Sequence, residues 1–472
     1  MEKGMKPQLA VDSYRAACRW FVPVYAVMLV MAWHFTLLRT VFADASFVLF
    51  HIVKDAAFAV QAYRFASMAT QFFAWLPVRL DLPLEAVLRS YSLGIVLFNF
   101  AAFAVCAFAL RSFRFALVIA LLNVLFITHL FFWIQTELPQ GLVWLVIGFA
   151  LVEQRDRLGL AAWPLAAFVF ATAAFAHYLV LVPFVFIVGY LLLRRDPCFN
   201  PRLLAAASST FVAVFLVKLL FFPVLYDSES IGALKAFVEW FPNYFNLKSN
   251  FNFFRECIWH YQWLVIAWLA ANAFFIKRRV WLMLVWFNAS APGYLLLINV
   301  TYFYGQLSFH AESMYTPLAL IVGVPVVFEL LPLLRRRFAI GLVAVLGVSF
   351  FVRVFSVAPQ YERHRDWMVS FLESHRERKL VIPERLVPMD TLMLAWGSPY
   401  EWWMLSTLRY NETASLIIHH DPALIETQMQ SSDVFITQYF GIYHHGELPK
   451  RYFNFTNRTD VYTLADSTML SR

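Results

Sequence analysis

The sequence contains little charge. Asp, Glu, Lys and Arg make up 14% of its 472 residues, whereas soluble domains carry about 25%. Hydrophobic residues reach 61%, with 50 phenylalanines and 16 tryptophans. This composition excludes a water-soluble fold and is typical of a protein whose aromatic rings pack in lipid or at its interfaces.

Cysteine is scarce as well. The four cysteines are Cys18, Cys106, Cys198 and Cys257, and they form no CxxC motif. The sequence therefore predicts no disulfide framework.

The basic residues are grouped into six clusters with long apolar stretches between them. The clusters are Lys3/Lys6/Arg15/Arg19, Arg111/Arg114, Arg155/Arg157, Arg194/Arg195/Arg202, Lys277/Arg278/Arg279 and Arg335/Arg336/Arg337. Each stretch is long enough to cross a bilayer out and back, and basic loops of membrane proteins face the cytoplasm. Most of the surplus that gives the net charge of +8 lies in these loops. The charge is therefore no argument for a nucleic-acid partner.

A transmembrane helix needs about 20 apolar residues. We predict eleven such helices, near residues 20–38, 86–110, 113–132, 136–152, 160–176, 178–193, 203–222, 261–276, 280–298, 314–331 and 338–357. The clusters place the N-terminus inside and the C-terminus outside, and they require the chain to turn back near His177. The expected fold is an all-α polytopic domain of residues 1–357 in a membrane, for which we expect the bacterial inner (plasma) membrane.

Four segments then fall outside the membrane. Residues 39–85 have the amphipathic pattern of helices that lie on the outer leaflet, and residues 223–260 and 299–313 form two further loops. Residues 358–472 are polar. They alternate short strand patterns (KLVI, ASLIIH, DVFIT, VYTLA) with helical patterns over 361–378 and 421–430. We predict a small extracytoplasmic α/β domain there.

Two acids of the first external loop are candidate site residues, and the first of them, Asp44, is a catalytic candidate. Asp44 follows the first span directly, and a carboxylate at the outer face could act as a general base on an acceptor hydroxyl or hold a metal. The alternative is an interfacial acid that caps a helix beginning at Ala45. Asp55 has the same two interpretations.

Two basic residues near the outer face are candidate ligands for a lipid phosphate. They are Arg64 in the first loop and Lys218 near the outer end of the seventh span. The alternative is that both side chains snorkel to the interface and anchor their helices.

Further polar residues fall at the same membrane level on other spans. Each has a structural explanation of its own, such as the helix dipole for an acid that opens the fourth span. Their convergence with Asp44 is what an outward-facing site would need. The set comprises Glu137, His177, Lys218 and Glu312, and His310 and Tyr315 beside Glu312 are further site candidates. The histidine pairs 419/420 and 444/445 match no standard zinc pattern, so we assign no metal site.

Three segments of the chain form a distinctive set: the loop FADASFVLFHIVKDAAF after the first span, the run HLFFWIQTELPQG with the basic loop and hairpin that follow it, and HAESMYTPLALIVGVP at a late span. Together they resemble the GT-C superfamily of integral-membrane glycosyltransferases. The resemblance covers most of residues 1–357 as an architecture.

This resemblance implies an enzyme that moves a sugar from a polyprenyl-phosphate donor to a glycan or lipid acceptor outside the cytoplasm. Asp44 matches the family's first-loop acid and would activate the acceptor, while Glu137 matches the acid that opens the fourth span. Arg64 or Lys218 would hold the donor phosphate. Many members carry paired acids in the first loop, whereas Ala45 follows Asp44 here, so the use of a divalent cation (Mg or Mn) stays open.

Two other functions are compatible with the sequence. A non-catalytic scaffold, or a binder of lipid-linked glycans, predicts that Asp44→Asn leaves function intact. A transporter is disfavoured, because the chain has neither an internal repeat nor a matched pair of broken helices.

Overall fold

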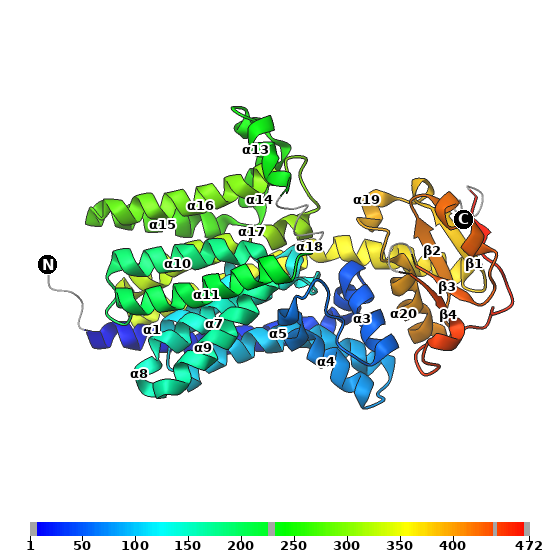
Figure 1. Ribbon diagram of the computed structural model, residues 1–472, viewed down its shortest axis with the longest axis horizontal. Coiled ribbons are helices and arrows are strands. Elements are labelled where there is room, and N and C mark those ends of the chain that lie inside the picture. The colour runs from blue at the N-terminus through cyan, green and yellow to red at the C-terminus, as the bar shows by residue number, and fades with distance from the viewer. Residues whose placement is uncertain (1–6, 225–231, 438–440, 467–472) are drawn as a thin grey trace.

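The computed structural model describes residues 7–224, 232–437 and 441–466 (Figure 1). Helices dominate, and most of them run side by side in an elongated bundle. A smaller lobe that contains all the described strands lies at the end of the bundle away from the N-terminus.

The bundle is built from apolar helices. Seven of the described helices are long and apolar enough to cross a membrane, some together with the short turns that flank them. They include α1 (Pro7–His34), α5 (Leu84–Ala104), α9 (Ala162–Ala176), α11 (Pro201–Phe221), α16 (Trp281–Thr301), α17 (Ser308–Pro325) and α18 (Arg336–His375). Shorter helices lie beside them: α6 (Phe113–Leu125), α7 (Glu137–Glu153), α10 (Leu181–Arg194) and α15 (Gln262–Arg278). Each expected span overlaps one of these helices, and the number that cross a membrane stays a prediction.

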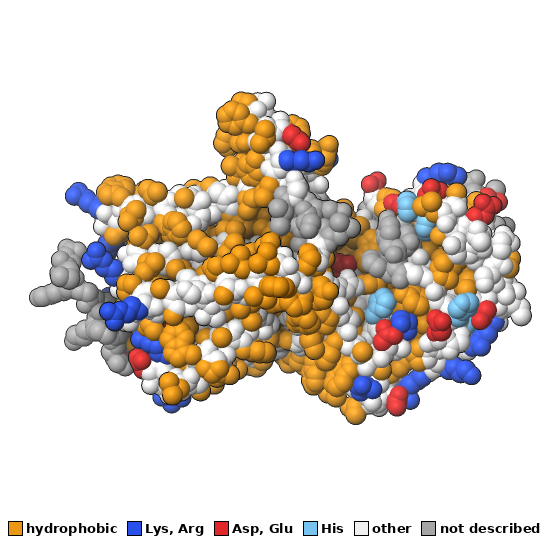
Figure 2. Space-filling view, viewed as in Figure 1, with side chains coloured by type: hydrophobic (Ala, Val, Ile, Leu, Met, Phe, Trp, Pro, Cys, Tyr) orange, Lys and Arg blue, Asp and Glu red, His pale blue; other side chains and the backbone are white. Residues whose placement is uncertain are grey.

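The outer surface of the bundle is apolar. Figure 2 shows hydrophobic side chains over much of the visible bundle. Phe168 of α9, Leu220 of α11 and Val285 of α16 are among the exposed large side chains. Because an apolar surface of this extent is unsuited to water, we conclude that the chain is an integral membrane protein in contact with membrane lipids.

Five of the six basic clusters lie at or beside turns between helices of the bundle, and Figure 2 shows Lys and Arg gathered at the end near the N-terminus. Of the first cluster, Arg15 and Arg19 lie within α1, whereas Lys3 and Lys6 lie outside the described residues. Hydrogen bonds join successive turns. Arg157 donates to the carbonyl of Ala109 at 3.0 Å, and Arg155 donates to that of Cys198 at 2.6 Å. This grouping is the one that the positive-inside rule requires. The side of the membrane on which it lies stays a prediction.

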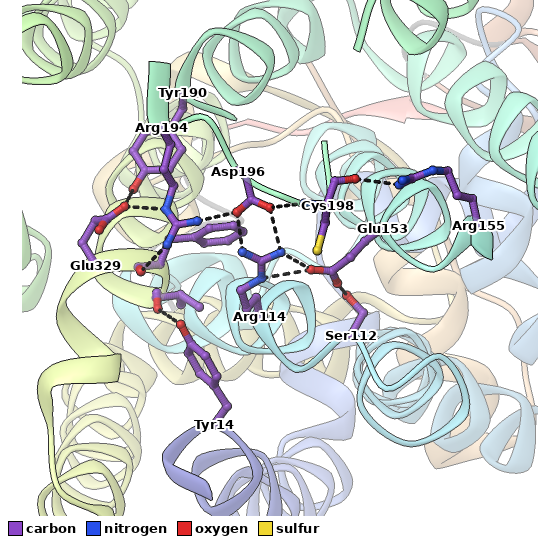
Figure 3. A network of polar contacts seen from close by, with 12 residues as sticks. Tyr14, Ser112, Arg114, Glu153, Arg155, Tyr190, Arg194, Asp196, Cys198 and Glu329 are labelled. Carbon is purple, nitrogen blue, oxygen red and sulfur yellow. Dashed lines mark hydrogen bonds and ion pairs between the residues drawn. The ribbon is translucent and has the colours of Figure 1, made fainter. Parts of the chain in front are cut away.

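A network of ion pairs ties the helix ends together at this basic end (Figure 3). The Arg114 guanidinium at the start of α6 contacts Glu153 at the end of α7, and it pairs with Asp196 at 2.5 Å. Arg194 at the end of α10 also contacts Asp196, and its Nε donates to Glu329 at 2.7 Å. The Asp196 side chain is fully buried. Since guanidinium groups compensate the buried carboxylates, we infer that the network fixes the register of the helix ends.

Residues 39–85, the predicted first external loop, are largely helical. A short helix, α2 (Thr36–Thr40), follows α1, and α3 (Ala43–Asp55) and α4 (Met68–Arg79) lead towards α5. Phe42 occupies the N-cap position of α3, so the interpretation of Asp44 as the cap of a helix beginning at Ala45 is wrong. Asp55 is the last residue of α3 and contacts Lys54. Its interpretation as an N-cap is wrong too.

The predicted second external loop, residues 223–260, contains α13 (Ala236–Glu239) and α14 (Lys248–Trp259). The short helix α8 (Arg155–Leu158) lies in the turn between α7 and α9.

Helix α18 runs past residue 358 without a break. Its buried positions continue at helical spacing through Val357, Tyr361, His364 and Met368, so one buried face extends from the bundle into the C-terminal lobe. The helix expected over residues 361–378 is therefore the second half of this 40-residue helix, not a separate element.

The C-terminal lobe contains a small parallel sheet. Its strands are β1 (Lys379–Pro383), β2 (Ser415–His419) and β5 (Thr463–Leu464), in the order β2–β1–β5. Lys379 of β1 pairs in register with Ser415 of β2, and α20 (Ser398–Tyr410) lies between these strands in the chain. A separate antiparallel pair consists of β3 (Val434–Ile436) and β4 (Ile442–His444), and two short helices are α19 (Met389–Leu392) and α21 (Glu426–Met429).

The first external loop and the C-terminal lobe share one hydrophobic core. The Phe50 ring of α3 packs against the rings of Tyr400 and Trp403 of α20, with centroids 5.0 and 5.6 Å apart. Phe47, one turn earlier, contacts Trp396. The lobe therefore packs against α3, the helix that carries Asp44 in its first turn.

Candidate functional site

A cavity of about 650 Å³ lies where the first loop, the bundle and the C-terminal lobe meet. Five of the sequence-predicted site residues line it: Asp44, Arg64, Glu137, His177 and His310. They come from α3, from the loop between α3 and α4, from the start of α7, from the turn between α9 and α10, and from α17. These residues are up to 266 positions apart in the chain (44 to 310), so the fold alone brings them to one place.

Asp44 lies in the first turn of α3 and faces the cavity. Its Oδ2 accepts a hydrogen bond of 2.7 Å from the indole Nε1 of Trp133. Burial raises the pKa of Asp44 to about 7, and the negative charge of Glu137 adds to this effect. The Trp133 hydrogen bond and the positive charge of Arg64 act in the opposite direction. A carboxyl group that titrates near neutral pH is suited to general-base catalysis.

The backbone beside Asp44 is strained. Ala43 has φ of +42°, which a residue with a Cβ adopts rarely. Its N–H donates to Glu401 Oε1 of α20 at 2.8 Å. Glu401 Oε2 in turn lies 2.7 Å from His364 Nε2 of α18. These contacts compensate the strain and fix the first turn of α3, which carries Asp44.

Arg64 and Glu137 form an ion pair at the cavity wall. Arg64 Nη1 lies 3.2 Å from Glu137 Oε2, and both side chains are largely shielded from solvent. Glu137 is the first residue of α7, where its charge also suits the helix dipole. Together with Asp44, the pair places one guanidinium and two carboxylates around a single cavity.

His177 lies in the turn between α9 and α10, where its side chain accepts from the N–H of Leu179 at 3.2 Å. Burial holds the pKa of His177 well below its usual value, and the positive charges of Arg64 and Lys218 contribute. Lys218 is therefore close enough to His177 to act on it electrostatically, although it is not a lining residue of the cavity. His177 is a neutral polar group at pH 7.

Glu312 and Tyr315 do not line the cavity. The Glu312 carboxylate accepts the backbone N–H groups of Thr128, His129 and Leu130 at 2.6, 3.0 and 2.9 Å. Tyr315 donates a hydrogen bond to Asn299. Glu312 thus fixes the connection between α6 and α7, which carries Trp133 and Glu137 into the site. Asp55, at the far end of α3, is half exposed and also lies outside the cavity lining.

Three residues that no sequence pattern singled out also line the cavity: Trp133, Gln135 and Trp396. Gln135 Oε1 accepts from the Tyr91 hydroxyl at 2.7 Å, while its buried Nε2 has no hydrogen-bond partner among the described residues. That amide is available to a bound ligand. Nothing in WIQTE separates these residues from the surrounding apolar run, and Trp396 is more than 250 positions away.

Metal ligands also occur near the site. Within the described residues, one group of three side chains is close enough to hold an ion: His129, Glu256 and His260. It does not include Asp44 or Glu137, so a divalent cation (Mg or Mn) at Asp44 stays a prediction.

Comparison with protein-family profiles, curated proteins and solved structures gives no match to this chain. The chemistry of the site is therefore argued from its own geometry.

Proposed function

We propose that the chain is a membrane glycosyltransferase of the GT-C type, which moves a sugar from a lipid-phosphate donor to an acceptor at the extracytoplasmic face. The observation that carries the proposal is the cavity of about 650 Å³, in which Asp44, with a pKa raised to about 7, faces the Arg64–Glu137 pair. The proposal includes eleven spans, an inside N-terminus, a C-terminal α/β domain outside, and the bacterial inner membrane.

The reaction needs a base, an anion site and protection from water. Asp44 takes the proton of an acceptor hydroxyl, whose oxygen attacks the anomeric carbon of the sugar. The bond from that carbon to the phosphate oxygen breaks, and polyprenyl phosphate leaves as an anion. Arg64 holds this phosphate by charge-assisted hydrogen bonds, and Lys218 adds positive potential nearby. The leaving group already carries negative charge, so it needs little help from an acid.

The direct test uses the full-length protein in proteoliposomes. A panel of polyprenyl-phosphate-linked sugars is supplied with candidate glycan and lipid acceptors, and release of polyprenyl phosphate is measured. We expect release from at least one donor that depends on an acceptor. Saturable donor binding without release across the panel would instead favour the glycan-binding scaffold, and accumulation of intact donor sugar inside the vesicles would favour a transporter.

The pH dependence of turnover tests the opposite effects of Trp133 and Glu137 on the pKa of Asp44. We expect kcat/KM of the wild type to rise with pH through an apparent pKa of about 7, because Asp44 acts only when ionised. Trp133→Phe removes a hydrogen bond that favours the ionised form, so this pKa rises. Glu137→Gln removes a negative charge, so it falls.

Opposite shifts in the two variants identify Asp44 as the titrating group, and pH–rate profiles measure them. Shifts in the same direction, or none in either variant, would mean that another group sets the pH dependence.

Arg64→Ala is expected to weaken donor use. Hydrogen bonds to charged groups contribute about 1.5–3 kcal/mol, so KM for the donor rises by roughly 10- to 150-fold. Assays well above pH 7 keep Asp44 ionised in both proteins. The matched control is Arg79→Ala, an exposed arginine at the end of α4 in the same external loop, which stacks near Trp75. Equal effects of the two variants would remove Arg64 from the donor site.

A further inference from the structure

Three metal-binding side chains gather on the extracytoplasmic side of the bundle, beside the proposed active site. His129 belongs to a 3₁₀ turn between α6 and α7, Glu256 lies in the last turn of α14, and His260 directly follows α14. Their ligand atoms all lie within 4.8 Å of one another. His129 is buried, whereas Glu256 and His260 are half-buried, so an ion has a path to the group.

The surrounding residues orient this group. His129 Nδ1 lies 3.3 Å from the Tyr361 hydroxyl, which leaves Nε2 for an ion. The backbone N–H of His129 is held by Glu312 at 3.0 Å, and the carbonyl of His260 is held by Arg353 at 2.6 Å. In metal-bound histidines the ring nitrogen that does not bind the metal usually makes a hydrogen bond, as His129 Nδ1 does with Tyr361. This bond fixes the tautomer and the orientation of the ring.

We propose that His129, Glu256 and His260 form a binding site for a divalent transition-metal ion, with Zn²⁺ as the favoured occupant. Two imidazoles and one carboxylate are a donor set that zinc uses, with a fourth position left for water. Imidazole ligands disfavour Mg²⁺ and Ca²⁺. The site is therefore distinct in chemistry and place from the cation considered for Asp44.

The local geometry accommodates an ion after a small adjustment. His260 Nδ1 already lies 2.5 Å from Glu256 Oε2, and an ion would replace the proton shared by this pair. Zinc ligands at about 2.0–2.2 Å from the metal lie about 3.4 Å apart. The His260–Glu256 pair must therefore open by about 1 Å, and ligand atoms separated by up to 4.8 Å must approach by up to about 1.4 Å. A cavity of about 30 Å³ lined by Glu256 and Tyr261 lies next to it, which is room enough for a water ligand.

An ion at this site would join two external segments. Glu256 and His260 belong to the second external loop, whereas His129 lies four residues before Trp133, the partner of Asp44. Binding would tie the loop to the connection that delivers Trp133 and Glu137 to the cavity. We therefore expect the bound ion to stabilise the outer face without contacting the donor.

The test is metal uptake by the full-length protein in nanodiscs, stripped with a chelator and then dialysed against Zn²⁺. We expect one zinc ion per chain by mass spectrometry of the metal, and a higher melting temperature with Zn²⁺ than with Mg²⁺. Co²⁺ substitution in the wild type should give the visible absorption of a four- or five-coordinate site. This measurement needs no variant and no activity.

Variants then assign the site. His129→Ala and His260→Ala should lose the bound zinc and its effect on the melting temperature. Glu256→Gln, a nearly isosteric change at a partly exposed residue, should weaken zinc uptake. His444→Ala removes an exposed histidine of β4 and should keep one ion per chain. Absence of saturable uptake by the wild type would overturn the proposal, as would unchanged uptake by all three site variants.

Discussion

Asp44→Asn should abolish most of the turnover of lipid-linked sugar. A positioned general base contributes about 10²–10⁴-fold to a rate, and we expect kcat to fall by that factor. The asparagine has the same size, and its amide oxygen can still accept the hydrogen bond from Trp133 Nε1. The geometry of α3 and the KM for the donor should therefore change little. Single-turnover release of polyprenyl phosphate from a saturating donor measures this effect.

Asp55→Asn is the matched control, because Asp55 lies on the same helix but is exposed and outside the cavity lining. It should retain wild-type turnover. If Asp44→Asn turns over donor as fast as Asp55→Asn, Asp44 is not the base, and another group must take the proton of the acceptor. Equal donor binding by both variants would show that the lost turnover of Asp44→Asn is not a folding defect.

Part of the site could be predicted from the sequence because the length of each apolar segment fixes the depth in the membrane at which its flanking residues lie. Asp44, Glu137 and His177 each lie directly beside an apolar segment, so hydropathy alone places them at helix ends. The structure places all three in the lining of one cavity, together with Arg64 and His310. Which helix ends are neighbours is not encoded in hydropathy, so the cavity itself could be suggested only as a convergence at one level.

The remaining roles depend on long-range contacts that a single sequence does not reveal. Glu312 has the same local character as Glu137, yet it is held by backbone N–H groups more than 180 positions away. The local sequence around Asp55 suggests a helix N-cap, whereas Asp55 is the last residue of α3. Helix α20 was missed because its Trp-rich first half is buried on all sides and has no amphipathic period.

The proposed metal site illustrates the same limit. The histidine pairs 419/420 and 444/445 are conspicuous because their members are adjacent in the sequence. His129 and His260 are 131 positions apart (129 to 260). Only Glu256 and His260 have a local signal, the spacing of four that places two side chains on one helix face. Their partner is supplied by the turn that Glu312 fixes.

The C-terminal lobe contributes to the site through Glu401. This carboxylate binds the Ala43 N–H with one oxygen and approaches His364 with the other. Gly397, at the N-cap of α20, is so close that a Cβ there would lie 3.0 Å from Ala43 Cα. The lobe thus reaches the backbone next to the proposed base directly, and the position of Asp44 depends on residues more than 350 positions away.

Glu401→Ala should therefore destabilise the protein and slow catalysis together. The variant leaves the buried His364 and the Ala43 N–H without their acceptor, and loss of one partner from a buried pair costs about 3–5 kcal/mol. Without that acceptor the strained Ala43 can relax, and Asp44 moves with it. We expect a lower melting temperature in nanodiscs and a fall in kcat that exceeds any change in donor KM.

Two further variants separate positioning from general destabilisation. Glu401→Gln keeps an oxygen for the Ala43 N–H, so it should recover most of kcat even where the melting temperature stays low. Glu373→Ala removes an exposed acid of α18 that pairs with Arg409 of α20 at 3.1 Å, and exposed pairs contribute only about 0–1 kcal/mol. If Glu401→Ala matches Glu373→Ala in both measurements, the lobe does not position Asp44. If Glu401→Gln is as slow as Glu401→Ala, the paired charge matters more than the acceptor at Ala43.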